Sequence, residues 1–409
     1  MAVAAVRFAG GGSRQDKYMR RSFASPIIQG LVKPLLQMIA FILGSGAILS
    51  LLMVILALLL RGSAVDQLAL SRNGVDLFSF TVGNLPQVLI DGMTLGFVYA
   101  AIALGYTMVY GVLEFINFAH SEIFAIGAFV GVEILIALQG SGMLVNASIL
   151  ASYSWLVFAI LAAMAAAGLA AVLVERIAYR PLRNAPRLVP LISAIGVSFF
   201  LQDAIRLIES LTTGQFHRII PSFGNFDDRL SIFNTTLGGT VFKLDMEVKS
   251  LWVIVAAVLM LLGLNYLVNT TRLGKAIRSV AQNQNVASLM GINVNAIISL
   301  TFLIGGALGG AAGVLYALKF TRIDPFVGFF PGLKAFTAAV MGGIGNLTGA
   351  LLGGIVLGML ETFAGAYLST FTMGAAGAEY KDILAFAILI LVLIFRPSGL
   401  LGEQVGQKA

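Results

Sequence analysis

A short stretch of the chain carries side chains that could hold a proton or bind a polar solute. The stretch "VYGVLEFINFAHSEIFAIGAF" runs from Val109 to Phe129, between two long apolar runs. Its polar side chains are Glu114, Asn117, His120, Ser121 and Glu122. Carboxyl, imidazole and amide groups are costly inside a lipid bilayer, so a chain that keeps them there usually uses them or gives them a partner.

Two interpretations of this stretch are open. In the first, Asn117, His120 and Glu122 line part of a path through the membrane or lock a gate by hydrogen bonding. In the second, the stretch is a cytoplasmic turn between two spans, with Glu114 in water and Asn117 capping the next helix. His120 and Glu122, one turn further in, then make structural hydrogen bonds.

Glycine marks a second place where the chain could open. The chain has 46 glycines, and most fall in apolar segments where small residues let helix backbones approach closely. In the stretch from Met341 to Gly349, however, they are too dense for a continuous helix. Backbone left free at membrane depth must line protein or water. The residues of a possible path or gate here are Gly342, Gly343, Gly345 and Asn346.

Motifs of catalysis are missing from the sequence. It contains no HExxH, CxxC or GxSxG, and Lys275 is followed by alanine where a P-loop needs serine or threonine. The chain has no cysteine and only two histidines, His120 and His217, so we expect no metal site. We expect no enzyme and no cofactor. If nucleotide hydrolysis energises the protein, another subunit must bind the ATP.

Composition places these residues in a membrane. Hydrophobic residues make up 58% of the chain and charged residues 11%, whereas soluble domains carry about 25% charged residues. Apolar runs of about 20 residues predict membrane-spanning helices. The segments are 38–60, 88–111, 117–138, 154–175, 188–208, 251–269, 294–318, 333–346, 347–370 and 381–395. We expect an all-α polytopic membrane protein of nine or ten transmembrane helices, with 333–346 as a half-span or re-entrant segment.

Basic residues predict the orientation of these segments. They occur without matching acidic residues in the N-terminal arm and in loops 176–187 and 270–293, which we therefore place in the cytoplasm. Connection 209–249 has balanced charges and is expected outside, built of short helices or strands. Both termini, including the tail 404–409, are then cytoplasmic. The net charge of +7 fits this orientation rule better than it fits nucleic-acid binding.

Residues 1–80 combine a basic arm with the apolar run Met38 to Leu60. At 1.5 Å per residue this run reaches roughly 34 Å, enough to cross a bilayer. The apolar region of a signal peptide has only about 7–15 residues. We therefore expect an uncleaved membrane anchor ahead of the main bundle.

Loop 270–293 joins basic residues to a polar stretch compatible with a helix. We expect a short helix over Ser279–Met290 and a stop at Gly291. Such a surface helix could receive force from a cytosolic motor; alternatively, phospholipid headgroups hold an ordinary basic loop. Candidate contacts with a motor are Arg278, Gln282, Asn283, Asn285, Ala287 and Gly291.

Five ordered motifs resemble those of permeases from the high-affinity branched-chain amino-acid ABC importers. They are "GFVYAAIALGYTMVYGVLEFINFAHSEIFAIGAF", "YRPLRNAPRLVPLISAIGVSFFLQD", "TRLGKAIRSVAQNQNVASLMGIN", "LKAFTAAVMGGIGNLTGALLGG" and "LIFRPSGLLGE". The resemblance covers most of 88–403, within a permease domain expected over 81–403. It departs from the family pattern at Ser121, where glycine is usual, and residues 1–80 lie outside it.

The resemblance implies an ABC-importer permease bundle with glycine-rich broken helices in the bacterial cytoplasmic (inner) membrane. It implies a second permease, homologous or identical, two cytosolic ATPases that bind ATP, and an extracytoplasmic substrate-binding protein. Loop 270–293 would couple to the ATPases. An importer of urea or short amides shares this skeleton. A stand-alone channel or secondary carrier is an alternative of another class, against which the basic loop argues. The exact substrate is not readable from the chain.

Overall fold

The structure, a computed structural model, describes residues 26–402 except 114, 146, 184, 187, 238, 239 and 397. Its α-helices are α2 (Pro26–Leu59), α3 (Ala64–Asn73), α4 (Leu77–Leu113), α5 (His120–Gly140), α6 (Ile149–Val174), α7 (Leu188–Thr213), α8 (Val248–Thr270), α9 (Arg272–Gln282), α10 (Gln284–Leu289), α11 (Val294–Phe320), α12 (Phe329–Gly342), α13 (Leu347–Phe371) and α14 (Lys381–Phe395). The predicted basic arm before residue 26, Glu114 and the tail 404–409 lie outside the described residues.

The remaining elements are short helical turns and strands. They are the π-helical turn η1 (Glu175–Tyr179), the 3-10 turns η2 (Arg180–Leu182) and η3 (Ala378–Tyr380), and the strands β1 (Arg218–Ile219), β2 (Arg229–Leu237), β3 (Thr240–Glu247) and β4 (Arg322–Ile323). All but one of the strand segments fall within the connection 209–249, for which short helices or strands were expected.

Eight of the described helices are long and apolar enough to cross a membrane, namely α2, α4, α5, α6, α7, α8, α11 and α13. The helices α12 and α14 are shorter, with 14 and 15 residues. Together these ten helices match the ten predicted apolar segments, and α12, the shortest of them, corresponds to the segment expected as a half-span or re-entrant segment. The expected class, an all-α polytopic membrane protein, is confirmed.

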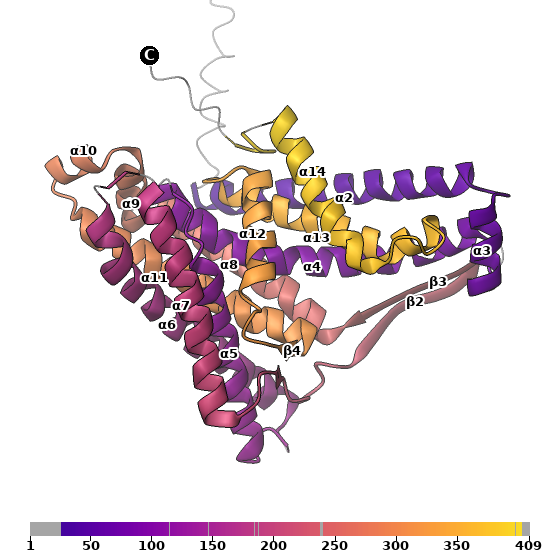
Figure 1. Ribbon diagram of the computed structural model, residues 1–409, viewed down its shortest axis with the longest axis horizontal. Helices are drawn as coiled ribbons and strands as arrows, with labels where there is room; N and C mark the ends of the chain where they lie inside the picture. The colour runs from indigo at the N-terminus through magenta and orange to yellow at the C-terminus, as the bar shows by residue number, and fades with distance from the viewer. Residues whose placement is uncertain are drawn as a thin grey trace, which may run out of the picture.

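The long helices form two groups that cross at an angle (Figure 1). In one group α2, α4 and α13 run side by side; in the other α5, α6, α7 and α11 do. The two groups are joined because α4 also packs along α11. The stretch Phe97–Val109 of α4 is buried throughout, so α4 is the central helix of the molecule.

Small residues set how closely the helices approach. A Cβ atom added to Gly127 of α5 would overlap the backbone of Gly310 of α11. One turn earlier in α11, Gly306 lies against Ala167 and Ala171 of α6. Helix association in lipid depends on such close van der Waals contact. The prediction that most glycines serve tight helix packing fits these contacts.

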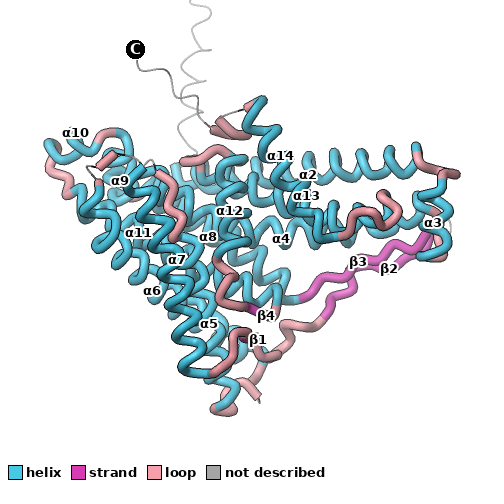
Figure 2. Tube along the Cα trace, in the orientation of Figure 1, coloured by secondary structure: helices cyan, strands magenta, loops and turns pink. Residues whose placement is uncertain are grey.

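The strands lie on the side of the molecule away from α9 and α10 (Figure 2). In this view β1 and β4 are near the lower middle, and β2 and β3 run along the lower right edge toward α3. Strands β2 and β3 form an antiparallel hairpin that pairs Arg229 with Glu247 and Leu237 with Thr240. The hairpin packs along the first turns of α4, where a Cβ on Gly83 would lie 2.8 Å from the carbonyl oxygen of Val241. Strands β1 and β4 form a second, two-residue pair.

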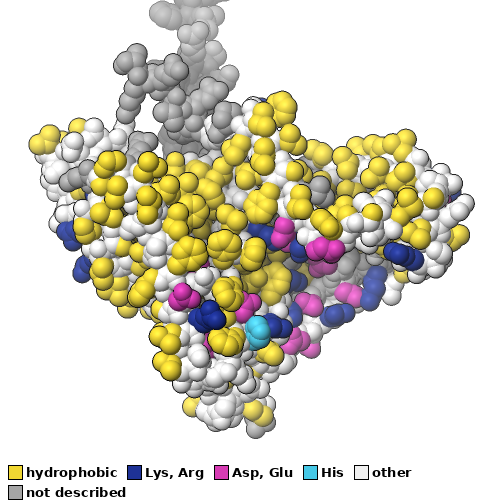
Figure 3. Space-filling view, in the orientation of Figure 1, with side chains coloured by type: hydrophobic (Ala, Val, Ile, Leu, Met, Phe, Trp, Pro, Cys, Tyr) yellow, Lys and Arg dark blue, Asp and Glu magenta, His cyan; other side chains and the backbone are white. Residues whose placement is uncertain are grey.

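The helices α2 and α3 precede the main bundle in the chain. Gly46 of α2 lies against Leu89 of α4, while much of the outer face of α2 consists of exposed leucine and isoleucine side chains. Asp66 of α3 accepts hydrogen bonds from the backbone N–H groups of Gly62 and Leu77, at 2.8 and 2.7 Å. These bonds hold the pKa of Asp66 below its usual value. On the face shown in Figure 3, apolar side chains are spread over both groups of helices, and charged side chains gather across the middle.

Candidate functional site

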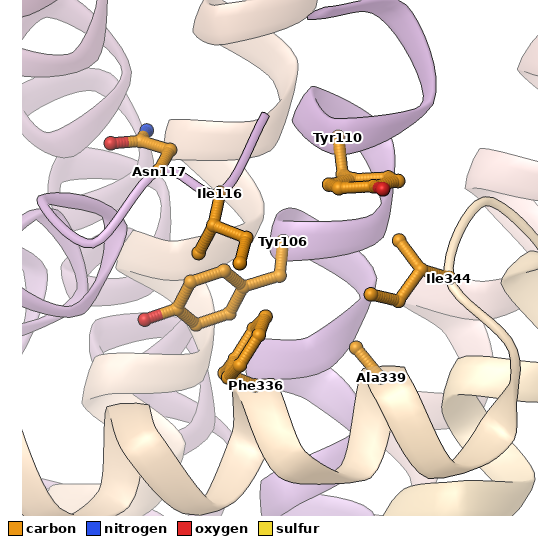
Figure 4. A pocket seen from close by; sticks show the side chains of 7 residues that line it. All are labelled: Tyr106, Tyr110, Ile116, Asn117, Phe336, Ala339 and Ile344. Carbon is orange, nitrogen blue, oxygen red and sulfur yellow. The ribbon is translucent and has the colours of Figure 1, made fainter. Parts of the chain in front are cut away.

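One predicted pathway residue, Asn117, lies across a small cavity from the glycine-rich stretch, although the two are far apart in the chain. Asn117 follows α4, and Ile344 lies in the glycine-rich break between α12 and α13. Both border one small cavity together with Tyr106, Tyr110, Ile116, Phe336 and Ala339 (Figure 4). Its volume of about 10 Å³ is about the room that one water molecule needs. In this conformation the cavity is too small for an amino acid.

Asn117 is buried and bonded to a distant helix. Its side-chain oxygen accepts a 2.6 Å hydrogen bond from the Tyr179 hydroxyl, and its amide nitrogen has no hydrogen-bond partner among the residues described. The expectation that Asn117 caps the next helix is wrong, because Ala119 occupies the N-cap position of α5 without a side-chain bond. A tertiary bond to Tyr179 has taken the oxygen that a local cap would use.

His120 begins α5 and is 1% exposed. Its ring meets the edge of Tyr106 at a centroid distance of 4.7 Å. Its Nε2 atom has no hydrogen-bond partner in the described part of the chain. A Cβ on Gly105 of α4 would overlap Nε2, so the imidazole fits only because that position is glycine.

Glu122 lies where α5, α7 and the approach to α12 meet. Its Oε1 atom accepts long hydrogen bonds from Ser121 (3.4 Å) and Ser198 (3.5 Å). Its Oε2 atom is buried without a partner among the described residues, and a Cβ on Gly328 would overlap it. Ser121, the departure from the family pattern, packs against Gly332 and donates to the Phe118 carbonyl at 2.7 Å. The structure thus pairs a serine at this position with a glycine across the contact.

The glycine-rich break has the conformation that its composition predicts. The helix α12 ends at Gly342, and Gly343 and Gly345 have φ angles of 107° and 92°, values that L side chains rarely adopt. The helix α13 restarts after Asn346, whose side-chain oxygen accepts from the N–H of Gly349 at 3.0 Å. The chain is therefore broken at 343–346.

A segment near the chain end, which we name the strap (398–402), closes this break. The backbone N–H of Leu400 donates to the Met341 carbonyl at 2.8 Å, and that of Leu401 to the Gly342 carbonyl at 3.0 Å. In return, the Asn346 amide donates to the Leu401 carbonyl at 2.9 Å. The strap satisfies carbonyls that the end of α12 leaves open. No local signal could have predicted this pairing.

The predicted coupling loop folds as two helices rather than one. The helix α9 begins at Arg272, capped by Thr271, which accepts from Gly274 at 3.0 Å. The expected helix over Ser279–Met290 is interrupted at Asn283, whose side chain caps α10 by accepting from Val286 at 3.0 Å. The chain turns away at Gly291, whose φ of 83° agrees with the predicted stop.

The six candidate residues of this loop differ in surroundings. Gln282, Asn283, Asn285 and Gly291 are exposed, whereas Ala287 is buried. The Arg278 guanidinium folds back and donates to the Val268 carbonyl at the end of α8. It therefore helps to satisfy the carbonyls at the end of that helix.

Apolar side chains at the tip of this loop were not predicted as site residues. Val286, Leu289 and Met290 are 53%, 86% and 78% exposed. Exposed apolar groups that lie together are typical of a surface that another protein or the membrane covers. In the sequence they looked like ordinary helix-face residues.

The sequence analysis also did not predict a network of buried ion pairs. The ammonium group of Lys334 in α12 lies 2.9 Å from the Glu361 carboxylate of α13 and 2.8 Å from Asp382 of α14. Lys381 lies 2.9 Å from Glu361, and the Tyr99 hydroxyl donates to the same carboxylate at 2.7 Å. The network joins four helices, and removing one member of a buried pair is strongly destabilising because a charge is left alone.

The chain is a polytopic helical bundle with glycine-lined helix contacts. It has a broken helix beside a small cavity and a helical loop with an apolar tip, features that suit a membrane permease. A family model described as the permease component of the branched-chain amino acid transport system matches residues 88–393. The chain belongs to this family, as its sequence motifs predicted.

Two curated relatives are similar to the chain over nearly their whole length. The high-affinity branched-chain amino acid transport system permease protein LivH of Salmonella typhimurium is 41% identical over 332 residues, which is 79% of this chain and 97% of that protein. BraD of Pseudomonas aeruginosa, described in the same words, is 41% identical over 324 residues, with the same shares.

More distant similarities are shorter. The ribose import permease protein RbsC of Escherichia coli is 30% identical over 135 residues, 32% of this chain and 40% of that protein. No solved structure matches the chain. The near-complete relatives are permease subunits of transporters, and this chain is a multi-pass membrane protein of the same family.

Proposed function

We propose that the chain is the membrane-spanning permease subunit of an ABC importer and forms part of the path for branched-chain or other neutral amino acids. The observation that carries this proposal is the 41% identity, over 97% of their length, with permeases named for high-affinity branched-chain amino acid transport. The absence of an ATP-binding motif from the sequence fits a subunit driven by others.

The two ends of the molecule offer surfaces for different proposed partners. Two cytosolic ATPases, which bind the ATP, would seat against α9 and α10, where Leu289 and Met290 project and Asn285 and Gln282 are exposed. A binding protein would deliver substrate at the opposite end, where β2 and β3 lie (Figure 2). A second permease, homologous or identical, would complete the path. The termini would be cytoplasmic, in a bacterial inner membrane.

The proposed path passes the cavity between Asn117 and Ile344. Asn117 borders this cavity. Nearby in the chain, His120 and Glu122 carry buried polar atoms without partners among the described residues, as Asn117 does. The backbone is broken at Gly343 and Gly345, on either side of Ile344. Unpaired polar atoms favour a state in which water or a polar solute reaches them. We assign these residues, with Gly342 and Asn346, to a gate that is closed in this conformation.

Reconstitution tests the proposal directly. The complete complex, placed in proteoliposomes with its binding protein, should import labelled leucine only when ATP is supplied. A competition series with leucine, alanine and urea separates an amino-acid importer from an importer of short amides. ATP-independent solute movement by the purified chain alone would instead identify a channel or secondary carrier.

Gly291→Arg tests the coupling loop. The control is Gly214→Arg, because both glycines have positive φ angles (83° and 68°) and neither has an atom within 4 Å of an added Cβ, so the backbone strain is matched. We expect only Gly291→Arg to weaken ATPase binding, by about tenfold or more, equivalent to about 1.4 kcal/mol. Pull-down of the ATPases and ATP-driven uptake measure the effect, and equal behaviour of the two variants would refute the assignment.

A further inference from the structure

The turn that follows α6 has an unusual helical form. Residues Glu175–Tyr179 make the π-helical turn η1, and its two end residues are buried, with Glu175 at 0% and Tyr179 at 1% exposure. Single π turns within α-helices are uncommon and are frequent at functional sites. Here one end of the turn bonds to α11, which follows the coupling loop, and the other end bonds to Asn117 at the small cavity.

One end of η1 is bonded to the first turns of α11. The Glu175 carboxylate accepts a 2.5 Å hydrogen bond from the Ser299 hydroxyl and forms an ion pair with Arg183. Arg183 in turn donates to the Asn295 side chain at 2.7 Å. The helix α11 begins at Val294, directly after the coupling loop. A displacement of α9 and α10 therefore reaches Glu175 through only a few residues of α11.

The other end of η1 is bonded to the wall of the cavity. The Tyr179 hydroxyl donates to the Asn117 side-chain oxygen at 2.6 Å. Its ring packs on Phe115 and Phe302, with centroids 5.6 and 5.8 Å away. Because Asn117 borders the cavity, a movement of Tyr179 changes the position or the bonding of the cavity wall.

The two ends differ in how readily they separate. The Glu175 carboxylate is fully buried, and a buried charge that loses its partner is heavily penalised. Glu175, Arg183 and Ser299 should therefore move as one unit with α11. The bond between Tyr179 and Asn117 joins two neutral groups and costs far less to break. The turn is thus firmly attached at the coupling side and can release at the cavity side.

We propose that η1 transmits the movement of the coupling loop to the cavity, with Glu175, Arg183 and Tyr179 as positioning residues. The inference rests on the proposed function, since it needs ATPases that push on α9 and α10. It adds that the hydrogen bond between Tyr179 and Asn117 makes the position of Asn117, in the proposed gate, depend on the position of α11. Spatial continuity alone does not establish coupling, so the test must measure coupling.

Tyr179→Phe in the complete complex is the decisive variant, because it removes one hydroxyl and keeps the ring. We expect stimulated ATP hydrolysis to stay within about twofold of the unmodified complex. Leucine imported per ATP hydrolysed should fall by about fivefold, equivalent to about 1 kcal/mol, the value of one neutral hydrogen bond. Asn117→Ala should give a similar loss, and the double variant should lose little more than either single variant.

Tyr153→Phe is the matched control. Tyr153 makes the same kind of bond, donating to the Asn225 side-chain oxygen at 2.9 Å, but it lies far from η1, beside the connection 209–249. Loss of the hydrogen bond between Tyr153 and Asn225 should leave the ratio of uptake to ATP hydrolysis unchanged. Ser299→Ala probes the other end of η1 without removing a charge and should also lower the ratio.

The outcomes separate the two proposals. If the unmodified complex imports neither leucine nor alanine when ATP is supplied, the proposed function fails and this inference fails with it. If the complex imports but Tyr179→Phe keeps the normal ratio, or lowers uptake and hydrolysis in equal proportion, the transmission role is overturned and the proposed function stands. A Tyr153→Phe variant that is as uncoupled as Tyr179→Phe would also overturn it.

Discussion

His120 illustrates what a buried polar group requires of its neighbours. Its Nε2 atom and the Oε2 atom of Glu122 are both buried without a partner among the described residues, and each faces a glycine, Gly105 or Gly328. A buried polar atom without a partner costs about 1–3 kcal/mol. These glycines therefore make space for the His120 and Glu122 side chains, which lack hydrogen-bond partners in this conformation. This is expected if the proposed gate also has an open conformation in which these side chains find partners.

At this scale Gly105→Ala should be destabilising. The added methyl group would overlap the His120 ring and would lie 2.9 Å from the Gly305 carbonyl oxygen. We expect the free energy of unfolding to fall by about 1–3 kcal/mol, as for other overpacked sites. Gly111→Ala, on the same helix with no atom within 4 Å of its new Cβ, is the control. Thermal unfolding in detergent measures both, and equal stabilities would contradict the packing described.

At the scale of elements, the broken pair α12–α13 is held by a third piece of chain. The strap supplies two backbone donors to the end of α12 and accepts one hydrogen bond from Asn346. These three hydrogen bonds pair backbone groups that the break would otherwise leave free, as membrane depth demands. The strap is thus a structural part of the proposed gate.

Gly399→Ala should loosen the strap. Gly399 and Gly142 have nearly equal φ angles of 79° and 78°, so alanine costs about 1–2 kcal/mol of backbone strain at either position. Only at Gly399 would the Cβ also lie 2.6 Å from Gly343 and 2.8 Å from Val340. We expect Gly399→Ala to lower the melting temperature more than Gly142→Ala does. A larger effect at Gly142 would show that the strap does not bear on the break.

The elements also show which features a sequence can predict. Hydropathy and glycine density predicted the ten apolar segments and the break at 343–346, because both signals are local. Asn117 was predicted as a cap from a local rule, and a partner 62 residues away, Tyr179, decided its role instead. The strap, the network around Lys334 and the bonds of Glu175 join residues that only the folded chain brings together. The interruption at Asn283 was readable as a capping signal but competed with a continuous helical pattern.

At the scale of the whole molecule, α2 and α3 stand apart from the family match, which begins at residue 88. Their contacts with the bundle are largely apolar, as where Leu49 and Met53 pack near Val88. Lipid tails are about as apolar as these side chains. The hydrophobic effect therefore contributes little to the packing of α2 on the bundle inside a membrane. The helix α2 is therefore expected to add an anchor to a bundle that folds without it.

Deleting residues 1–76 tests this expectation. The shortened chain loses the hydrogen bond that the N–H of Leu77 donates to Asp66, worth about 1 kcal/mol as a helix cap. Lipid replaces the apolar contacts that are lost. We expect it to insert and to purify as a monodisperse complex with its partners. ATP-driven uptake should stay within about twofold, since a loss of about 1 kcal/mol is less than the total stability of a folded domain, about 5–15 kcal/mol. A deletion of residues 1–25, which keeps α2 and α3, controls for loss of the basic arm. If only the longer deletion abolishes folding or uptake, α2 is part of the working bundle, because its packing on α4 and α13 would then be needed to hold the central helix in place.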